Sequence, residues 1–138
     1  MEHNAMPGGV ILIVEDNPAN LLLARVMLER SGWRIVEARS TDEAQQVLRS
    51  TTPDLILMDV GLPGRDGLSL TSELKAAPDT RAIPIVALTA HAMQSDRDRA
   101  YAAGCDGYLS KPFKAQQLRD EIARVLAAEP AAPLADER

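Results

Sequence analysis

Three acidic side chains follow two apolar runs of the sequence and could together hold a metal ion. Glu15 and Asp16 come directly after Val10–Val14, and Asp59 comes directly after Leu55–Met58. If these acids converge, two unit charges about 4 Å apart repel by about 4 kcal/mol at an effective dielectric constant near 20. Such a cluster needs a cation or a raised pKa. Its ligand atoms are all hard oxygens, which favours Mg²⁺ over zinc or copper.

A hydroxyl and an amine follow two further apolar runs. Thr89 comes after Ile85–Leu88, and Lys111 comes shortly after Gly107–Leu109. A carboxylate nucleophile, a magnesium ion, a lysine and a directed hydroxyl donor are groups that suit in-line phosphoryl transfer. That reaction depends mainly on positioning and on the neutralisation of charge.

The elements that carry these side chains alternate between strand and helix patterns. The β-branched and aliphatic runs predict five strands, at Val10–Val14, Arg34–Ala38, Leu55–Met58, Ile85–Leu88 and Gly107–Leu109. Capping residues and apolar periodicity predict five helices, from Pro18 to Ser31-Gly32, from the Ser40 cap through Ser50, from after Gly67 to about Ala77, over Gln94–Ala103 and from about Lys114 to Ala128.

This alternation predicts an α/β fold with an open parallel sheet, right-handed crossovers and helices on both faces. In such sheets, ligands bind at the carboxyl ends of the strands. The five polar side chains meet this condition, because each follows a predicted strand.

Composition bounds the remaining possibilities. The chain of 138 residues suits one domain, expected over residues 10–128, with a loose lead at 1–9 and a frayed tail at 129–138. Its net charge of −5, with no basic patch, argues against binding to nucleic acid or to a membrane surface. The single cysteine, Cys105, and the lack of a signal-peptide pattern predict a cytoplasmic protein.

Four segments resemble the receiver domains of bacterial two-component response regulators. They are VEDNPAN (Val14–Asn20), LILMD with GLPGRDG (Leu55–Gly67), ALTAHA (Ala87–Ala92) and AGCDGYLSKPF (Ala103–Phe113). The resemblance covers most of the chain, from about Val10 to Ala128. It implies a flavodoxin-like receiver fold with strand order 2-1-3-4-5, in which the first and third strands are neighbours.

The resemblance also implies roles for the acidic residues. Asp59 matches the phosphoacceptor. Asp16 matches the acid that binds Mg²⁺ directly, and Glu15 matches the acid that usually acts through water. Gly61, two residues after the acceptor, matches the position whose backbone carbonyl binds the metal.

Three further residues match positions around the phosphoryl group. Thr89 matches the hydroxyl that hydrogen-bonds the phosphoryl oxygens, and Lys111 matches the lysine that pairs with them. The Lys111-Pro112 peptide is expected to be cis. Tyr108 matches the aromatic switch residue, which is expected to rotate when Thr89 moves toward the phosphoryl group.

The partners that the resemblance implies are proteins. The phosphoryl donor is expected to be a histidine kinase or a histidine phosphotransfer protein. A downstream protein effector is expected to bind the fourth helix, fifth strand and fifth helix. The sequence has room for no DNA-binding or catalytic output domain, so the chain is expected to be a switch rather than an enzyme. Two forms stay open: a free-standing regulator and the receiver segment of a hybrid histidine kinase.

Two rival functions remain on the same architecture. A flavodoxin-like FMN carrier is disfavoured, because the acidic loop EDNPAN lacks the donors of a phosphate cradle. An aspartyl-phosphate phosphatase usually carries a second acid two residues after the nucleophile, where this chain has Gly61. The lifetime of the phosphorylated state is left open, since Gly61 lacks a side chain and His91 lies near the same mouth.

Overall fold

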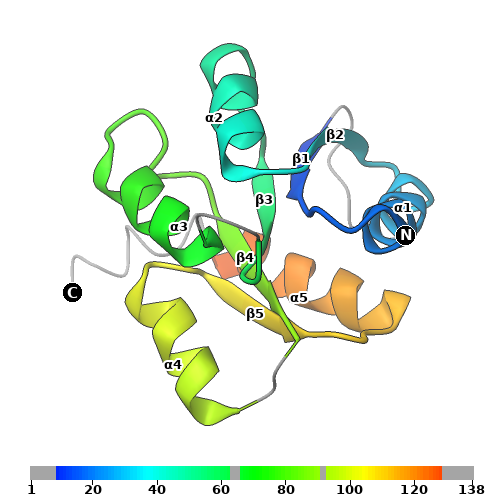
Figure 1. Cartoon of the computed structure of the whole chain (residues 1–138). Helices are drawn as coiled ribbons and strands as arrows, with labels where there is room; N and C mark the ends of the chain where they lie inside the picture. The colour runs from blue at the N-terminus through cyan, green and yellow to red at the C-terminus, as the bar shows by residue number, and fades with distance from the viewer. Residues whose placement is uncertain (1–8, 63–65, 91–92, 129–138) are drawn as a thin grey trace.

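The computed structural model describes residues 9–62, 66–90 and 93–128. Within these ranges the chain alternates strictly between strand and helix (Figure 1). The elements are β1 (Val10–Val14), α1 (Pro18–Glu29), β2 (Arg34–Ala38), α2 (Thr41–Ser50), β3 (Leu55–Asp59), α3 (Gly67–Ala76), β4 (Ile85–Thr89), α4 (Gln94–Ala102), β5 (Gly107–Ser110) and α5 (Ala115–Ala128).

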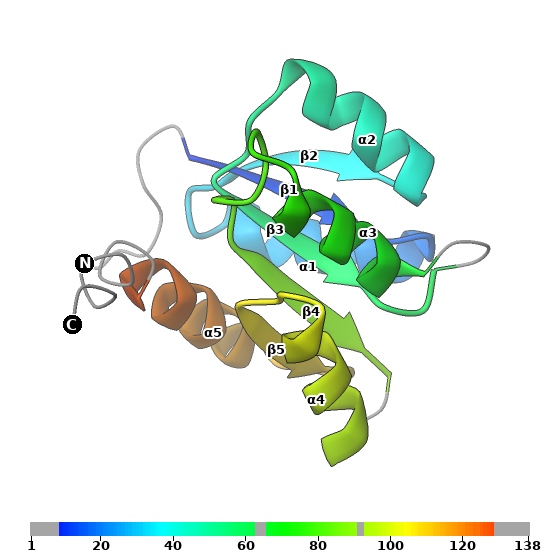
Figure 2. The same ribbon diagram turned by 90° about the vertical axis from the view of Figure 1, so that its left-hand side faces the viewer.

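The five strands form one parallel sheet in the order β2-β1-β3-β4-β5, as predicted. β1 pairs with β2 on one side and with β3 on the other, so the first and third strands are neighbours. The strands run in one direction, and their carboxyl ends therefore lie along one edge of the sheet (Figure 2).

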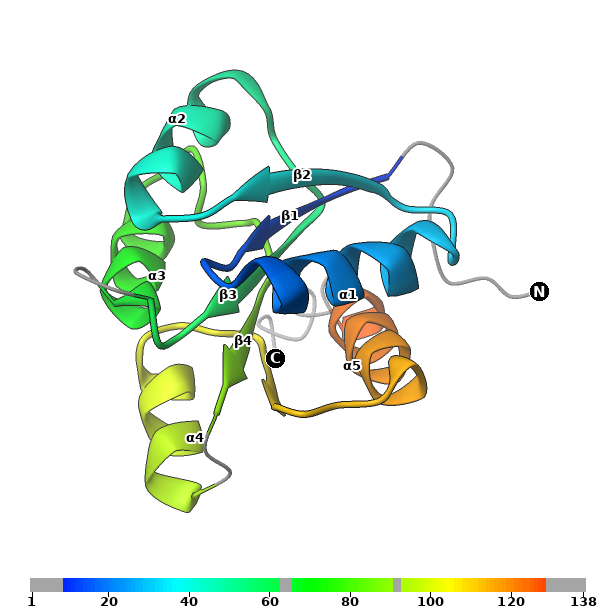
Figure 3. The same cartoon turned by 45° about the vertical axis from the view of Figure 1, so that its right-hand side comes forward.

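Helices cover both faces of the sheet (Figure 3). α1 and α5 pack on one face, where Leu21 and Leu28 of α1 join Leu118 and Ile122 of α5 in one buried cluster. α2, α3 and α4 pack on the other face around a second cluster. These two layers explain why β3 and β4 read as continuous apolar runs, because every residue of both strands is buried.

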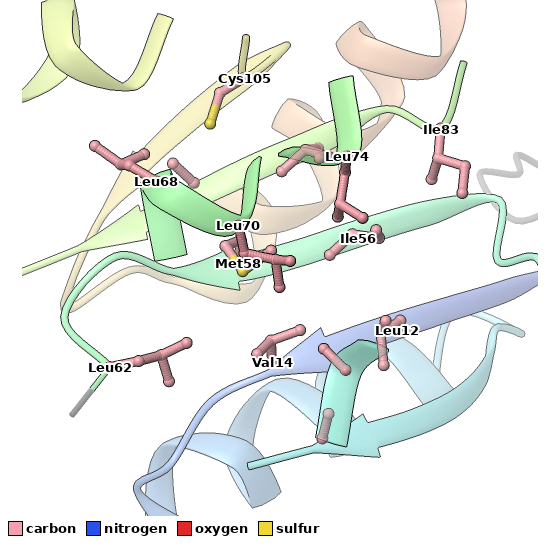
Figure 4. Packing of buried hydrophobic residues seen from close by; sticks show 14 of the residues in the cluster. Leu12, Val14, Ile56, Met58, Leu62, Leu68, Leu70, Leu74, Ile83 and Cys105 are labelled. Atoms are coloured by element: carbon pink, nitrogen blue, oxygen red, sulfur yellow. The ribbon is translucent and has the colours of Figure 1, made fainter. Parts of the chain in front are cut away.

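In the second cluster, α3 packs against β3. Leu68, Leu70 and Leu74 of α3 lie over Ile56 and Met58 of β3 (Figure 4). Leu70, Ile56 and Met58 have no exposed surface. Burial on this scale contributes roughly 1.5–3 kcal/mol for each large apolar side chain. The packing holds β3, and with it Asp59, in a fixed position.

Side-chain caps start α1 and α2 where the sequence predicts. The Asn17 side chain accepts hydrogen bonds from the amides of Ala19 and Asn20, with Pro18 in the first turn of α1. Ser40 Oγ accepts from the Glu43 amide at 3.1 Å.

The predicted bounds of β1 and β2 agree with the structure, whereas several others differ from it by one to three residues. α1 ends at Glu29, before the predicted Ser31-Gly32 step, because the chain turns there and Gly32 adopts a φ of +96°. α4 ends at Ala102, and Gly104 closes it with a φ of +109°. β3, β4 and β5 each extend one residue further than predicted.

A lysine joins three segments at the amino ends of β4 and β5. Lys75 Nζ lies 2.9 Å from Asp106 Oδ2, and it donates to the carbonyls of Ile83 (2.8 Å) and Arg81 (3.3 Å). The same Asp106 oxygen accepts from the Ile85 amide at 2.9 Å. We call Lys75, Asp106 and these three backbone groups the amino-end network. It fastens α3 to the starts of both strands.

Parts of the sequence-based predictions fall outside the described residues. The expected lead (except Gly9), the tail and His91 belong to this group. Gly9 itself is buried, and its carbonyl accepts from the Arg34 amide at 2.9 Å. Among the helices of the described ranges, none has the length and apolar character needed to cross a bilayer.

Candidate functional site

The carboxyl edge of the sheet brings the predicted polar side chains together. Glu15 and Asp16 follow β1, Asp59 is the last residue of β3, Thr89 is the last residue of β4, and Lys111 follows β5. Because β1, β3 and β4 are consecutive in the sheet, residues more than forty positions apart in the sequence meet at this edge.

The three carboxylates converge closely enough to share one cation. One carboxylate oxygen from each of Glu15, Asp16 and Asp59 lies within 4.8 Å of the other two. Glu15 and Asp59 are only 2% and 4% exposed, whereas Asp16 is half-buried. Three acids in such a setting repel one another, and only oxygen atoms are offered as ligands. This donor set fits a hard divalent cation.

Lys111 forms ion pairs with two of the three acids. Its Nζ is 3.0 Å from Glu15 Oε1 and 3.3 Å from Asp59 Oδ1. The Lys111 amide donates to the Thr89 carbonyl at 2.7 Å, which ties the loop after β5 to the end of β4. The Lys111-Pro112 peptide is cis, as predicted.

Burial and charge act in opposite directions on the two partners of this ion pair. Burial raises the pKa of Glu15, and the charge of Asp59 raises it further, although the hydrogen bond from Lys111 opposes both effects. Burial alone would lower the pKa of Lys111. The hydrogen bond to Glu15 and the charge of Asp59 outweigh that effect and raise it. Lys111 is therefore firmly cationic, while Glu15 holds its proton more tightly than an ordinary glutamate.

Asp59 is oriented by its own loop. Its Oδ1 accepts a hydrogen bond from the Gly61 amide at 3.1 Å. The Val60 amide donates to the Leu88 carbonyl at 2.8 Å, which continues the pairing of β3 with β4 past Asp59. Gly61 is exposed, and together with Asp59 it lines the cavity over the acids.

Thr89 and Tyr108 are linked on the neighbouring strands. Thr89 is 4% exposed, and Tyr108 is half-buried on β5. Burial raises the pKa of Tyr108, the charge of Asp96 adds to this, and a side-chain hydrogen bond with Thr89 opposes it. The predicted switch residue therefore contacts the predicted phosphoryl-binding hydroxyl. The predicted rotation of Tyr108 stays a prediction.

A cavity of about 350 Å³ opens over the acids, and it includes residues that the sequence analysis did not select. Besides the predicted residues, Asn17, Asn20, Asp96 and Arg99 line it. Asp96 and Arg99 come from α4, one helical turn apart. Their sequence context, QSDRDRAYA, is typical of a solvated helix, so only the placement of α4 indicates that one of its faces borders the site.

An apolar cavity of about 300 Å³ adjoins the acidic one. The two cavities share Glu15, Asn20 and Lys111 as lining residues. The remaining lining is apolar and comes from α1, from the loop after β5 and from strands β1 and β4, including Leu23 and Phe113. On the outer surface of α1, Leu22 and Leu23 are 60% and 51% exposed.

Residues 11–123 match the response regulator receiver domain. The chain belongs to this family. It is 42% identical over 112 residues to the polar-differentiation response regulator DivK of Brucella ovis, covering 81% of this chain and 91% of that protein. The receiver resemblance is thus confirmed, and it places the chain in two-component phosphorelay signalling.

Solved receiver structures share the architecture. The receiver domain of a sensor histidine kinase from Pseudomonas aeruginosa, with a magnesium ion in its active-site cleft, superposes with a TM-score of 0.79 at 40% identity, covering 87% of this chain and 98% of that one. The signal receiver domain of a histidine kinase from Syntrophus aciditrophicus gives 0.80 at 37% identity, with 88% and 92% covered.

Proposed function

We propose that Asp59 of this receiver domain accepts a phosphoryl group from a phosphohistidine on a partner protein. The observation that carries the proposal is the meeting of a buried carboxylate, two further acids and a lysine at one open cavity. An oxygen of Asp59 attacks the phosphorus atom and forms an acyl phosphate. The phosphorus–nitrogen bond breaks, and its electron pair returns to the imidazole of the donor.

Glu15, Asp16 and Asp59 fit a magnesium ion, because their oxygens lie within reach of one site and offer no soft ligand. Asp16, Asp59 and the Gly61 carbonyl would bind the ion directly, and Glu15 would act through water. When bound, the ion offsets the negative charge of the acids and of the phosphoryl oxygens. A magnesium ion in the cleft of the Pseudomonas aeruginosa relative supports this assignment.

Lys111 and Thr89 complete the proposed site. Lys111 Nζ already lies 3.3 Å from Asp59, so it can pair with a phosphoryl oxygen at Asp59 after a small shift. Thr89 would donate a hydrogen bond to a second oxygen. Because Thr89 is hydrogen-bonded with Tyr108, its movement would release Tyr108 and change the surface of β5.

The proposed donor is a histidine kinase or a histidine phosphotransfer protein that docks on α1. Leu22, Leu23 and Val26 are exposed on this helix by 60%, 51% and 39%. The adjoining apolar cavity opens beside Glu15 and Lys111, so a protein seated there would have its phosphohistidine next to the site. An apolar surface at this place would serve docking of a protein, and the net charge of −5 disfavours binding to nucleic acid or to an anionic membrane surface.

The proposed output is a protein contact and not an enzymatic product. A downstream effector would bind the surface of α4, β5 and α5, where Tyr101 is 38% exposed. The switch would act in the cytoplasm, where the buried thiol of Cys105 stays reduced; burial raises its pKa to about 11. Similarity to DivK and to kinase receiver domains fits either a free-standing regulator or a hybrid-kinase segment.

Phosphorylation tests this function directly. The protein is incubated with Mg²⁺ and acetyl phosphate or a phosphorylated histidine phosphotransfer domain, and its intact mass is measured. We expect one added phosphoryl group on the wild type, none on Asp59→Asn, and normal labelling of the exposed control Asp42→Asn. Persistent labelling of Asp59→Asn would place the acceptor elsewhere.

A further inference from the structure

One positively charged side chain at the acidic cavity has no role in the proposed phosphoryl transfer. Arg99 of α4 lines the cavity together with Asp59, Thr89 and Lys111. Its guanidinium lies 3.7 Å from Asp96 Oδ1, and 59% of its side chain is exposed. That separation exceeds a hydrogen-bond distance, so charge alone holds the guanidinium beside Asp96. No hydrogen bond of the Arg99 side chain to another described residue competes with this contact.

The net charge of the cavity after phosphorylation favours the approach of a further positively charged side chain. Three carboxylates face one ammonium group, so a bound divalent cation brings the cluster to neutrality. Phosphorylation replaces the single negative charge of the Asp59 carboxylate with a phosphoryl group that carries roughly 1.5 to 2 negative charges, so the cluster gains roughly one half to one negative charge. Lys111 is already shared between Glu15 and Asp59. The phosphorylated cavity would therefore be negative again, with one exposed guanidinium at its rim.

We propose that Arg99 is a second phosphoryl-binding cation, which Asp96 holds at the rim of the cavity until a phosphoryl group arrives at Asp59. This inference rests on the proposed function of Asp59. A guanidinium offers several donors in a planar fork that matches phosphoryl oxygens, and its exposed stem is free to swing. Asp96 acts against binding in two ways, since it repels the anion and retains the arginine.

The position of Asp96 links this exchange to the switch residue. Asp96 lies close enough to Tyr108 for its charge to raise the pKa of that hydroxyl. When Arg99 leaves Asp96 for the phosphoryl group, the carboxylate loses its counter-ion beside Tyr108. Binding at Asp59 thus changes the electrostatic surroundings of the surface that α4 and β5 share.

The test measures binding of beryllofluoride, a phosphoryl mimic, in the presence of Mg²⁺ by ¹⁹F NMR. Arg99→Gln should weaken binding roughly three- to tenfold, as expected for a partly exposed charge-assisted contact. Asp96→Asn should leave binding equal or make it up to about threefold tighter, because it frees Arg99. The matched control is Arg97→Gln, which removes the same charge from the same helix at a residue that does not line the cavity.

The dependence of beryllofluoride affinity on salt concentration is a second readout. A purely structural role of Arg99 would not produce the salt dependence expected here. The difference between the wild type and Arg99→Gln should shrink as NaCl is raised toward about 1 M, where the Debye length is about 3 Å. Equal affinities of wild type and Arg99→Gln, or an equal loss in Arg97→Gln, would overturn the role of Arg99. Failure of the wild type to bind, or undiminished binding by Asp59→Asn, would instead overturn the proposed function.

Discussion

Two lysines contact carboxylates at opposite ends of the same sheet, and the two regions differ in the balance of charge. In the amino-end network, Lys75 contacts one acid, Asp106, and two backbone carbonyls. At the carboxyl end, Lys111 faces Glu15 and Asp59, with Asp16 beside them. The two lysines are nearly equally buried, with 18% and 20% of their side chains exposed.

This difference in charge balance distinguishes a structural ion pair, at Lys75, from a ligand-binding site, at Lys111. At the amino end, each charge and each polar group has a partner within the chain, so the arrangement only holds α3, β4 and β5 together. At the carboxyl end, the acids outnumber the cation, and the surplus creates affinity for something from outside. A buried excess of one charge costs stability, and chains retain such an arrangement where a ligand completes it.

The largest effect on stability is expected at the amino end. Replacing Lys75 with Met leaves Asp106 and two carbonyls without their cation, which should cost about 2–3 kcal/mol of unfolding free energy. Urea unfolding measures the loss, with the exposed Lys114→Met as control. Mg²⁺ should not restore the stability. Recovery with Mg²⁺ would contradict the division between the two regions.

Replacing Lys111 with Met is expected to behave differently. Without Mg²⁺ the change should cost about 1–2 kcal/mol, because three acids then lack a counter-ion. With Mg²⁺ the difference from the wild type should narrow, since Lys111 and the ion compete for the same carboxylates. The measurement is urea unfolding with and without saturating Mg²⁺. An equal loss under both conditions would show that Lys111 does not share its acids with a metal.

Removal of a single acid should change the free energy of unfolding in opposite directions in the two regions. Asp59→Asn should stabilise the metal-free protein by about 1 kcal/mol, because it relieves repulsion from Glu15 and Asp16. Asp106→Asn should destabilise by a similar amount, because it removes the charge that Lys75 contacts. Thermal unfolding in EDTA compares the two variants. Loss of stability in both would mean that the acids at the carboxyl end are fully balanced by Lys111.

The smallest effect is the response of the metal site to pH. Because burial raises the pKa of Glu15, this carboxyl keeps its proton at pH values where free glutamate, with a pKa of about 4.3, is ionised. In metal-free protein the proton relieves the buried charge, so the contribution of Glu15 to stability improves as pH falls through the raised pKa. Mg²⁺ affinity should decline over the same range.

Calorimetric Mg²⁺ titrations between about pH 7.5 and pH 5 would measure this decline, because that range lies above the ordinary glutamate pKa. Glu15→Gln should flatten the profile above the ordinary glutamate range. An unchanged slope in this variant would assign the proton to another group.

The sequence was sufficient to predict the sheet and the main residues of the site. Apolar runs followed by single polar residues predicted the strands, and the parallel topology required their ends to share one edge. The convergence of Glu15, Asp16, Asp59 and Lys111 required in addition the strand order 2-1-3-4-5, which the resemblance to receiver domains implied. Local capping rules placed the starts of α1 and α2 correctly, because those contacts involve residues close in sequence.

Other features depended on packing that the sequence does not display. In α1, three consecutive leucines gave no clear face, and only the structure shows Leu21 buried while Leu22 and Leu23 are exposed. Arg99 belongs to a charged run in which neighbouring residues look equivalent. The position of α4 relative to the ends of β4 and β5 selects Arg99, and not Arg97, to line the cavity.

Crystals soaked in Mn²⁺, an anomalous scatterer with the oxygen preference of Mg²⁺, test the shared cation site most directly. The account predicts one anomalous peak in direct contact with carboxylate oxygens of Asp16 and Asp59 and with the Gly61 carbonyl. A peak away from these residues, or no peak at saturating Mn²⁺, would contradict the claim that the three acids share one ion.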